Sequence, residues 1–98
     1  MHAGIDVAKY QKLIDDKNYW AKSRSEKRKG LSKITIDKAP EALYFPKCRS
    51  IHTFKMKFDI QVLFFDRKRN LLAMKKAKPN RMVRSPKGTR SILEIPCK

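Results

Sequence analysis

One stretch near the middle of the chain constrains the fold more than any other feature. Between Ile51 and Asp66 the sequence reads IHTFKMKFDIQVLFFD, and every second position from Phe54 to Phe64 is apolar. The positions between them are polar or charged as far as Gln61. Side chains on a strand alternate between two faces, whereas a helix would scatter these residues around its axis. The pattern therefore predicts one continuous strand with one face on a core.

Shorter segments on both sides of this run also predict extended structure. Residues 34–36 and 42–45 are candidate strands, and Pro46 closes the second. The sequence DRKRN at 66–70 predicts a hairpin loop, and NLLAMKKA at 70–77 predicts the return strand. The remaining segments are a turn, a short extended piece, a type I turn and a last strand, at 78–81, 82–84, 85–88 and 89–96.

The first third of the chain contains the helical signals. The segment from Ile5 to Ile14 is weakly periodic and is compatible with a short helix or an early strand, and residues 19–21 predict the end of a strand. Ser23 and Glu26 match a capping box, and Gly30 suits the end of a helix, so a short helix is predicted near residues 24–29. The predicted fold is mainly β (α+β), a small curled or barrel-like antiparallel sheet with that one short helix.

Length and composition set the remaining bounds. The chain has 98 residues, of which 41% are hydrophobic, so residues 1–98 are expected to form a single domain. No run approaches the roughly 18 apolar residues of a membrane span, and the polar, acidic N-terminus is unlike a signal peptide. We therefore expect a cytoplasmic protein in which Cys48 and Cys97 are reduced thiols.

The charge is concentrated near the carboxyl end. The chain carries 25 basic and 9 acidic residues, a net charge of +16, and residues 67–98 hold eleven of the basic residues but only one acidic residue, Glu94. Such a surface attracts polyanions, with nucleic acid first and anionic lipid second. The same pattern is also typical of a face that only promotes solubility.

The basic residues of this region are the first candidate site. They are predicted to hold phosphates without reading bases, which makes binding strongly dependent on salt. The set is Arg67, Lys68, Arg69, Lys75, Lys76, Lys78, Arg81, Arg84, Lys87 and Arg90. Tyr19, Trp20 and Tyr44 are candidates for base stacking, although aromatic residues in so small a domain usually belong to the core.

Four sequence blocks, taken in order, are similar to a known family. The blocks are A21-x-S23-x-x-x-x-R28-x-G30-L31, C48-x-x-I51-H52-T53-x-x-M56, the strand end F64-F65-D66, and S91-x-L93-E94-I95-P96. Over residues 21–96 the chain resembles the uncharacterised family named domain of unknown function 192. The resemblance implies a mainly β, barrel-like sheet with a short helix at the R-x-G-L block, and no established activity.

The chain also departs from the family pattern. Asp59 and Gln61 stand where family members usually have Pro and Asp, and Cys97 stands where they have glycine. Family members continue with a further strand, whereas this sequence ends at Lys98. A missing strand would leave an unpaired sheet edge, so a second copy of the chain is an expected partner.

A second candidate site consists of Cys48 and His52. A cysteine nucleophile beside a histidine base is one interpretation, but no group that would orient the imidazole is identifiable. The favoured interpretation is structural, with His52 facing the core or its rim and bonding a main-chain carbonyl. Together with Cys97, the pair lacks the close ligand spacing of a zinc site, and no phosphate-binding glycine loop occurs, so no metal or cofactor is predicted.

Two acidic residues receive structural roles. Asp66 is predicted to bond nearby amides in a turn, and Glu94 is predicted to form a surface ion pair with Arg90 or another cation. The sequence thus favours a non-enzymatic module that holds an anionic polymer such as nucleic acid. The alternatives are a small-ligand or enzymatic domain centred on His52 and Cys48, and an accessory protein that binds an acidic protein partner.

Overall fold

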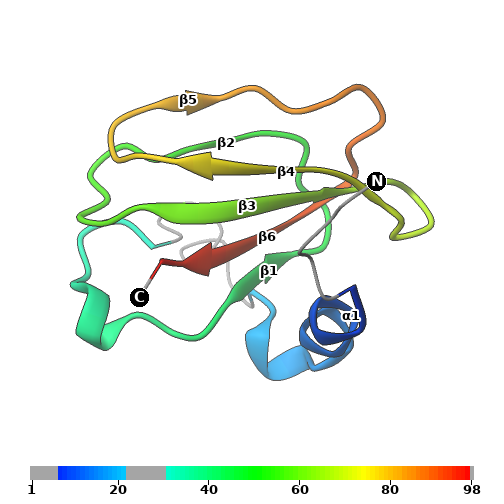
Figure 1. The fold of residues 1–98 in the computed structure, drawn as a ribbon, viewed down its shortest axis with the longest axis horizontal. Coiled ribbons are helices and arrows are strands. Elements are labelled where there is room, and N and C mark those ends of the chain that lie inside the picture. The colour runs from blue at the N-terminus through cyan, green and yellow to red at the C-terminus, as the bar shows by residue number, and fades with distance from the viewer. Residues whose placement is uncertain (1–6, 22–30, 98) are drawn as a thin grey trace.

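The computed structural model describes residues 7–21 and 31–97. Figure 1 shows short helical segments followed by the strands of the fold. In chain order the elements are α1 Val7–Asp15, η1 Lys17–Tyr19, η2 Ile36–Lys38, β1 Leu43–Phe45, β2 Ile51–His52, β3 Ile60–Phe65, β4 Leu71–Ala77, β5 Met82–Val83 and β6 Ser91–Pro96.

The strands form two antiparallel sheets, and the prediction of a mainly β fold is confirmed. The main sheet has the order β1-β6-β3-β4, and β2 pairs with β5 in a separate two-stranded ribbon. The main sheet does not close into a barrel, because β1 and β4 are its two edges. The last strand, β6, lies inside the sheet, and the recruitment of a second copy through an edge stays a prediction.

Both faces of the main sheet are covered. On one face α1 contributes Leu13 and Ile14 to a helix-side core, which also contains Leu63 of β3 and Leu93 of β6. On the other face the ribbon packs on a ribbon-side core built around residues such as Phe64. Figure 1 shows α1 and the ribbon on opposite sides of the sheet. The chain is therefore layered as helix, sheet and ribbon.

The central strand is shorter than predicted, and it is buried on both faces. It begins at Ile60, while residues 53–59 form turns that connect it to β2. Phe54 is 43% exposed, although the remaining apolar positions from Met56 to Phe64 are buried as expected. Leu63, of the opposite parity, is also fully buried because α1 covers that face. The expectation of a single core face was therefore wrong.

Several other segments also differ from the prediction. Residues 34–36 are not a strand, since a 3-10 turn occupies Ile36–Lys38. Residues 19–21 are not a strand end either, because Tyr19 ends a 3-10 turn and Trp20 makes only an isolated bridge. The segment from Ile5 to Ile14 resolves as a helix, α1, over its described part. The predicted helix near residues 24–29 lies outside the described residues.

The carboxyl-terminal half follows the prediction closely. Strand β1 occupies most of 42–45, the 66–70 loop joins β3 to β4 as a hairpin, and β5 and β6 fall within 82–84 and 89–96. The turn at 85–88 is displaced by one residue, because the Thr89 N–H donates to the Pro86 carbonyl at 3.3 Å. Gly88 then takes the third turn position with φ of +94°, which suits glycine and is typical of a type II turn.

Thr53 connects the turns after β2 to the turn before β5. Its side chain is fully buried, and its hydroxyl donates to the Lys78 carbonyl at 2.6 Å and accepts from the Arg81 N–H at 2.8 Å. The Thr53 N–H also donates to the Arg81 carbonyl at 2.8 Å. One residue therefore positions two loops that are distant in sequence.

We expect Thr53→Val to lower the free energy of unfolding by about 1–3 kcal/mol, because valine keeps the shape but leaves buried main-chain groups unpaired. Urea unfolding followed by the fluorescence of Trp20, the one tryptophan of the chain, measures the change. Thr53→Ser, which retains the hydroxyl, is the matched control and should lose less. Equal losses in the two variants would show that packing of the methyl group, and not the hydrogen bonds, is responsible.

Candidate functional site

Two loops that are distant in sequence meet at one end of the main sheet. The Arg90 N–H donates to the Phe65 carbonyl at 2.8 Å, just before the hairpin loop at 66–70. The Arg90 carbonyl in turn accepts from the Cys48 N–H at 3.1 Å. These bonds place Arg90 between the hairpin loop and the segment around Arg49.

The meeting point is an open, positively charged hollow. One part, of about 850 Å³, is lined by Asp66, Arg67, Lys68, Asn70, Gly88 and Arg90. A smaller part, of about 250 Å³, is lined by Arg49, Ser85, Pro86, Gly88, Thr89 and Arg90. Because Gly88 and Arg90 line both parts, they form one surface, which we call the basic hollow. It carries four cations, Arg49, Arg67, Lys68 and Arg90.

The hairpin loop is fixed by the acidic residue of the hollow. The Asp66 carboxylate accepts from the Lys68 N–H at 2.8 Å and from the Asn70 N–H at 2.9 Å. These bonds hold the pKa of the Asp66 carboxyl below its ordinary value, and the bond from the Asn70 N–H has the largest effect. The predicted turn role of Asp66 is thus confirmed. Most of its hydrogen-bonding capacity is used within the loop, and not toward the hollow.

The other predicted basic residues are more widely distributed. The Lys75 ammonium donates to the Arg84 carbonyl and lies 5.6 Å from the centre of the Phe64 ring. The Lys76 ammonium is 3.9 Å from the Asp59 carboxylate, a separation at which an exposed pair contributes little. Lys78 and three further members of the set, Arg81, Arg84 and Lys87, are exposed but do not line the basic hollow. The structure therefore gathers only part of the predicted set.

Arg69 points from the hairpin loop toward the helical layer. Its guanidinium lies 5.4 Å from the centre of the Trp20 ring, and the Lys17 ammonium lies 5.5 Å from the same ring. The Trp20 indole N–H donates to the Ile14 carbonyl at 2.6 Å, which fixes the ring against the end of α1. Cation–π contacts of this kind hold Arg69 beside α1, next to the basic hollow.

The remaining stacking candidates are used within the fold. Tyr44 is 1% exposed and belongs to the helix-side core, so it is not available to a base. The Tyr19 hydroxyl donates to the Glu41 carboxylate at 3.0 Å, and this contact raises the pKa of Tyr19. Of the three aromatic candidates, Trp20 is the one in contact with a cation of the predicted set.

Cys48 lies just before β2 and His52 ends β2, and each side chain contacts the main chain. His52 is exposed and stacks on Phe54, with ring centres 4.6 Å apart, so the expectation that it faces the core or its rim was wrong. Its Nδ1 accepts from the Phe54 N–H at 3.2 Å, whereas a bond to a carbonyl was predicted. The Cys48 thiol donates to the Ser50 carbonyl at 3.0 Å. Neither side chain lines the basic hollow.

Cys97 is the third residue, with Cys48 and His52, that was considered as a metal ligand from the sequence. Burial raises the pKa of the Cys97 thiol. Within residues 7–21 and 31–97, no group of three histidine, cysteine or acidic side chains is arranged to hold a metal ion.

The same residues contain no helix that is long and apolar enough to cross a membrane.

Glu94 is buried, which overturns the prediction of a surface ion pair. Its side chain is 2% exposed, and its register opposite Val62 of β3 and Leu43 of β1 places it on the ribbon-side face. Its Oε1 atom has no hydrogen-bond partner among the described residues. Burial raises the pKa of the Glu94 carboxyl to about 8. The one acidic residue of 67–98 is therefore mainly protonated at pH 7.

Two components of the basic hollow were missed from sequence. Arg49 lies outside the dense basic region, and the Cys48–Arg90 main-chain bond brings this segment to Arg90. Gly88 was assigned to a turn, but it also lines both parts of the hollow. The proline and glycine of the 85–88 turn predicted the loop, yet nothing local indicates which other loop it contacts.

Comparison with known proteins identifies no relative: no family model, no curated protein and no solved structure matches the chain. The resemblance to domain of unknown function 192 stays a prediction. The geometry and the charge of the basic hollow are therefore the features of the molecule that bear on its function.

Proposed function

We propose that the protein is a binding module that holds the phosphate backbone of a nucleic acid in the basic hollow. The observation that supports this function most directly is the convergence of four cations from three separate segments on one open surface. The cations come from the hairpin loop, from the residue that precedes β6 and from the segment before β2. An extended, regularly spaced polyanion is the ligand that such a surface fits best.

The surrounding charges favour the same ligand. The carboxylate of Asp66 is bonded within its own loop. The raised pKa of the Glu94 carboxyl keeps that group mainly uncharged at neutral pH. The positive charge of residues 67–98 is therefore opposed by little acidic charge of their own. The contacts available to a phosphate come from exposed arginine and lysine side chains, so they position a backbone and do not read base sequence.

Salt dependence is the quantitative test of this function. Each phosphate that is neutralised contributes about −0.7 to the slope of log K against log salt for a single strand, so four cations predict a slope of about −3. Raising the salt from about 50 to 200 mM should then weaken binding roughly 50-fold. Fluorescence anisotropy with an end-labelled single-stranded 12-mer measures the slope.

Two outcomes would contradict the proposal. One is the absence of binding at about 50 mM salt, where phosphate contacts are strong. The other is equal affinity for polyglutamate of the same length, which would indicate an acidic protein partner and not a phosphate backbone. Polyglutamate is therefore the control polyanion for the titration.

A further inference from the structure

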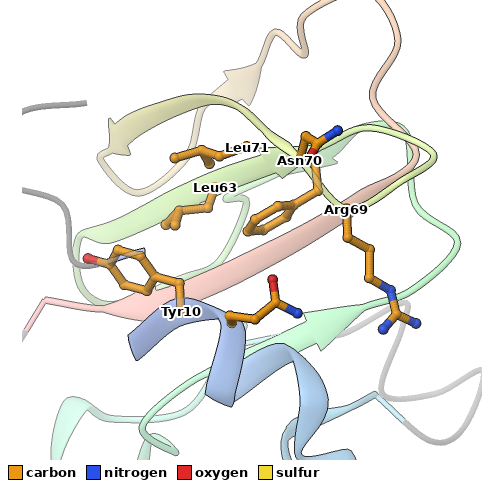
Figure 2. A pocket seen from close by; sticks show the side chains of 7 residues that line it. Tyr10, Leu63, Arg69, Asn70 and Leu71 are labelled. Carbon is orange, nitrogen blue, oxygen red and sulfur yellow. The ribbon is translucent and has the colours of Figure 1, made fainter. Parts of the chain in front are cut away.

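A second, more enclosed cavity lies beside the basic hollow. It opens between α1 and the strands β3 and β4, has a volume of about 130 Å³, and is lined by Tyr10, Gln11, Leu63, Phe65, Arg69, Asn70 and Leu71. Figure 2 shows Tyr10 rising from α1 on one side, Leu63 and Leu71 on the strands, and Arg69 and Asn70 at the loop end. We call this cavity the side pocket.

The size of the side pocket limits what it can hold. An apolar cavity of about 150 Å³ accommodates one benzene molecule, so a volume of 130 Å³ suits a single six-membered ring. A fused two-ring system needs more room. The pocket is thus suited to the ring of a pyrimidine.

The lining of the side pocket is also suited to a base. Leu63, Phe65 and Leu71 supply apolar surface, and Tyr10 supplies an aromatic ring at the wall. Gln11 and Asn70 add side-chain amides. The Gln11 amide donates to Asp15 at 3.0 Å and the Asn70 amide donates to Asp66 at 3.3 Å, so the oxygen and the second N–H of each amide are left for a ligand. A pyrimidine has apolar faces and a hydrogen-bonding edge, and this combination of surfaces matches it.

The side pocket and the basic hollow are neighbours on the hairpin loop. Asn70 lines both, and Arg69, at the side pocket, directly follows Lys68, at the basic hollow. Trp20 holds the Arg69 guanidinium in place at this junction. When the phosphates of a nucleic-acid strand occupy the basic hollow, one nucleotide of that strand therefore lies next to the side pocket.

From this arrangement we infer that the side pocket takes one unstacked pyrimidine of a single-stranded nucleic acid. The inference rests on the proposed function, since the phosphates in the basic hollow bring the base to the pocket. A base within a duplex is stacked and paired, so it cannot enter a pocket between a helix and a sheet without being extruded. Single strands are the substrate class that this site selects.

The test compares three single-stranded 12-mers of equal charge at about 50 mM salt. The first is abasic at every position, the second carries one central thymine, and the third carries one central adenine. Stacking of one base contributes about 1–3 kcal/mol, so the thymine should raise affinity roughly 5- to 150-fold over the abasic strand. The adenine should raise it less, because its two fused rings exceed the pocket.

Two variants locate the effect. Leu71→Phe fills the side pocket and Tyr10→Ala removes its wall, so each should abolish the gain from thymine while leaving abasic affinity unchanged. Met74→Phe is the matched control, because Met74 lies on the same strand, pairs with Leu63 and does not line the pocket. It should keep the full gain.

The outcomes separate this inference from the proposed function. Equal binding of the thymine and abasic strands, or a thymine gain that survives both pocket variants, overturns the base site but leaves the phosphate site supported. An adenine gain equal to that of thymine overturns the assignment to pyrimidines. No binding of any strand overturns the proposed function, and the base site with it.

Discussion

Raising the pH from 5 to 9 is expected to lower the free energy of unfolding of the protein by several kcal/mol relative to a Glu94→Gln variant. The cause is the burial of the Glu94 carboxyl, which raises its pKa from 4.5 to about 8 in the folded protein. In the unfolded chain the same group titrates near its ordinary value. Folding therefore favours the protonated form of Glu94.

The sign follows from proton linkage. Below pH 4.5 the carboxyl is protonated in both states and contributes no slope. Between pH 4.5 and about 8 the folded state binds the proton that the unfolded state has lost, so stability falls as the pH rises. The slope in this window approaches about 1.4 kcal/mol per pH unit, which gives a total loss of about 5 kcal/mol above pH 8.

Urea unfolding at pH 5, 7 and 9, followed by Trp20 fluorescence, measures this loss. Glu94→Gln keeps the size of the side chain and removes the titration, so the difference between the two proteins isolates the contribution of this one carboxyl. Glu94→Met has no polar end to leave unpaired, so at pH 9 it should be more stable than Glu94→Gln. A difference that stays constant from pH 5 to 9 would show that Glu94 ionises normally in the folded protein.

The sequence could not have predicted the burial of Glu94. It stands in the segment ILEIP, where alternation places it with Ile92 on one face and Leu93 with Ile95 on the other. An acidic residue in such a strand ordinarily indicates the face that is exposed to water. Strand β6 lies inside the sheet, however, and both of its faces are covered, one by α1 and the other by the ribbon. Alternation indicates which residues share a face, but not whether a second layer covers that face.

The same limit explains the error in the central strand. The apolar parity from Met56 to Phe64 was identified correctly, and it does face the ribbon-side core. Leu63, of the other parity, is buried because the first helix packs across the sheet from a segment some fifty residues earlier. That packing depends on tertiary contacts. The weak periodicity of the first segment did not indicate which part of the chain the helix would pack against.

The turns were more predictable than the faces. Asp66 and the polar loop that follows it encode a hairpin through local hydrogen bonds, which require no distant partner. Gly88 likewise marks a turn through its positive φ, although the register was displaced by one residue. Local chemistry therefore located the two loops, whereas their contact through Arg90 required the folded sheet.

The second large effect is expected from charge reversal within the basic hollow. Arg67→Glu combined with Arg90→Glu removes two of its four cations and places two carboxylates among the others. We expect the affinity for a single-stranded 12-mer to fall at least about 100-fold at 50 mM salt, because phosphate contacts are lost and repulsion replaces them. Both side chains are exposed, so the fold should be retained.

The control must change the net charge by the same amount at another place. Lys78→Glu combined with Arg84→Glu does so, since both side chains are exposed and neither lines the basic hollow. Through the general field alone, this control should weaken binding less than about tenfold. Equal losses in the two double variants would mean that total charge determines binding. A loss confined to Arg67 and Arg90 would instead assign binding to the loops that converge at the end of the sheet, where cations from three separate segments share one surface.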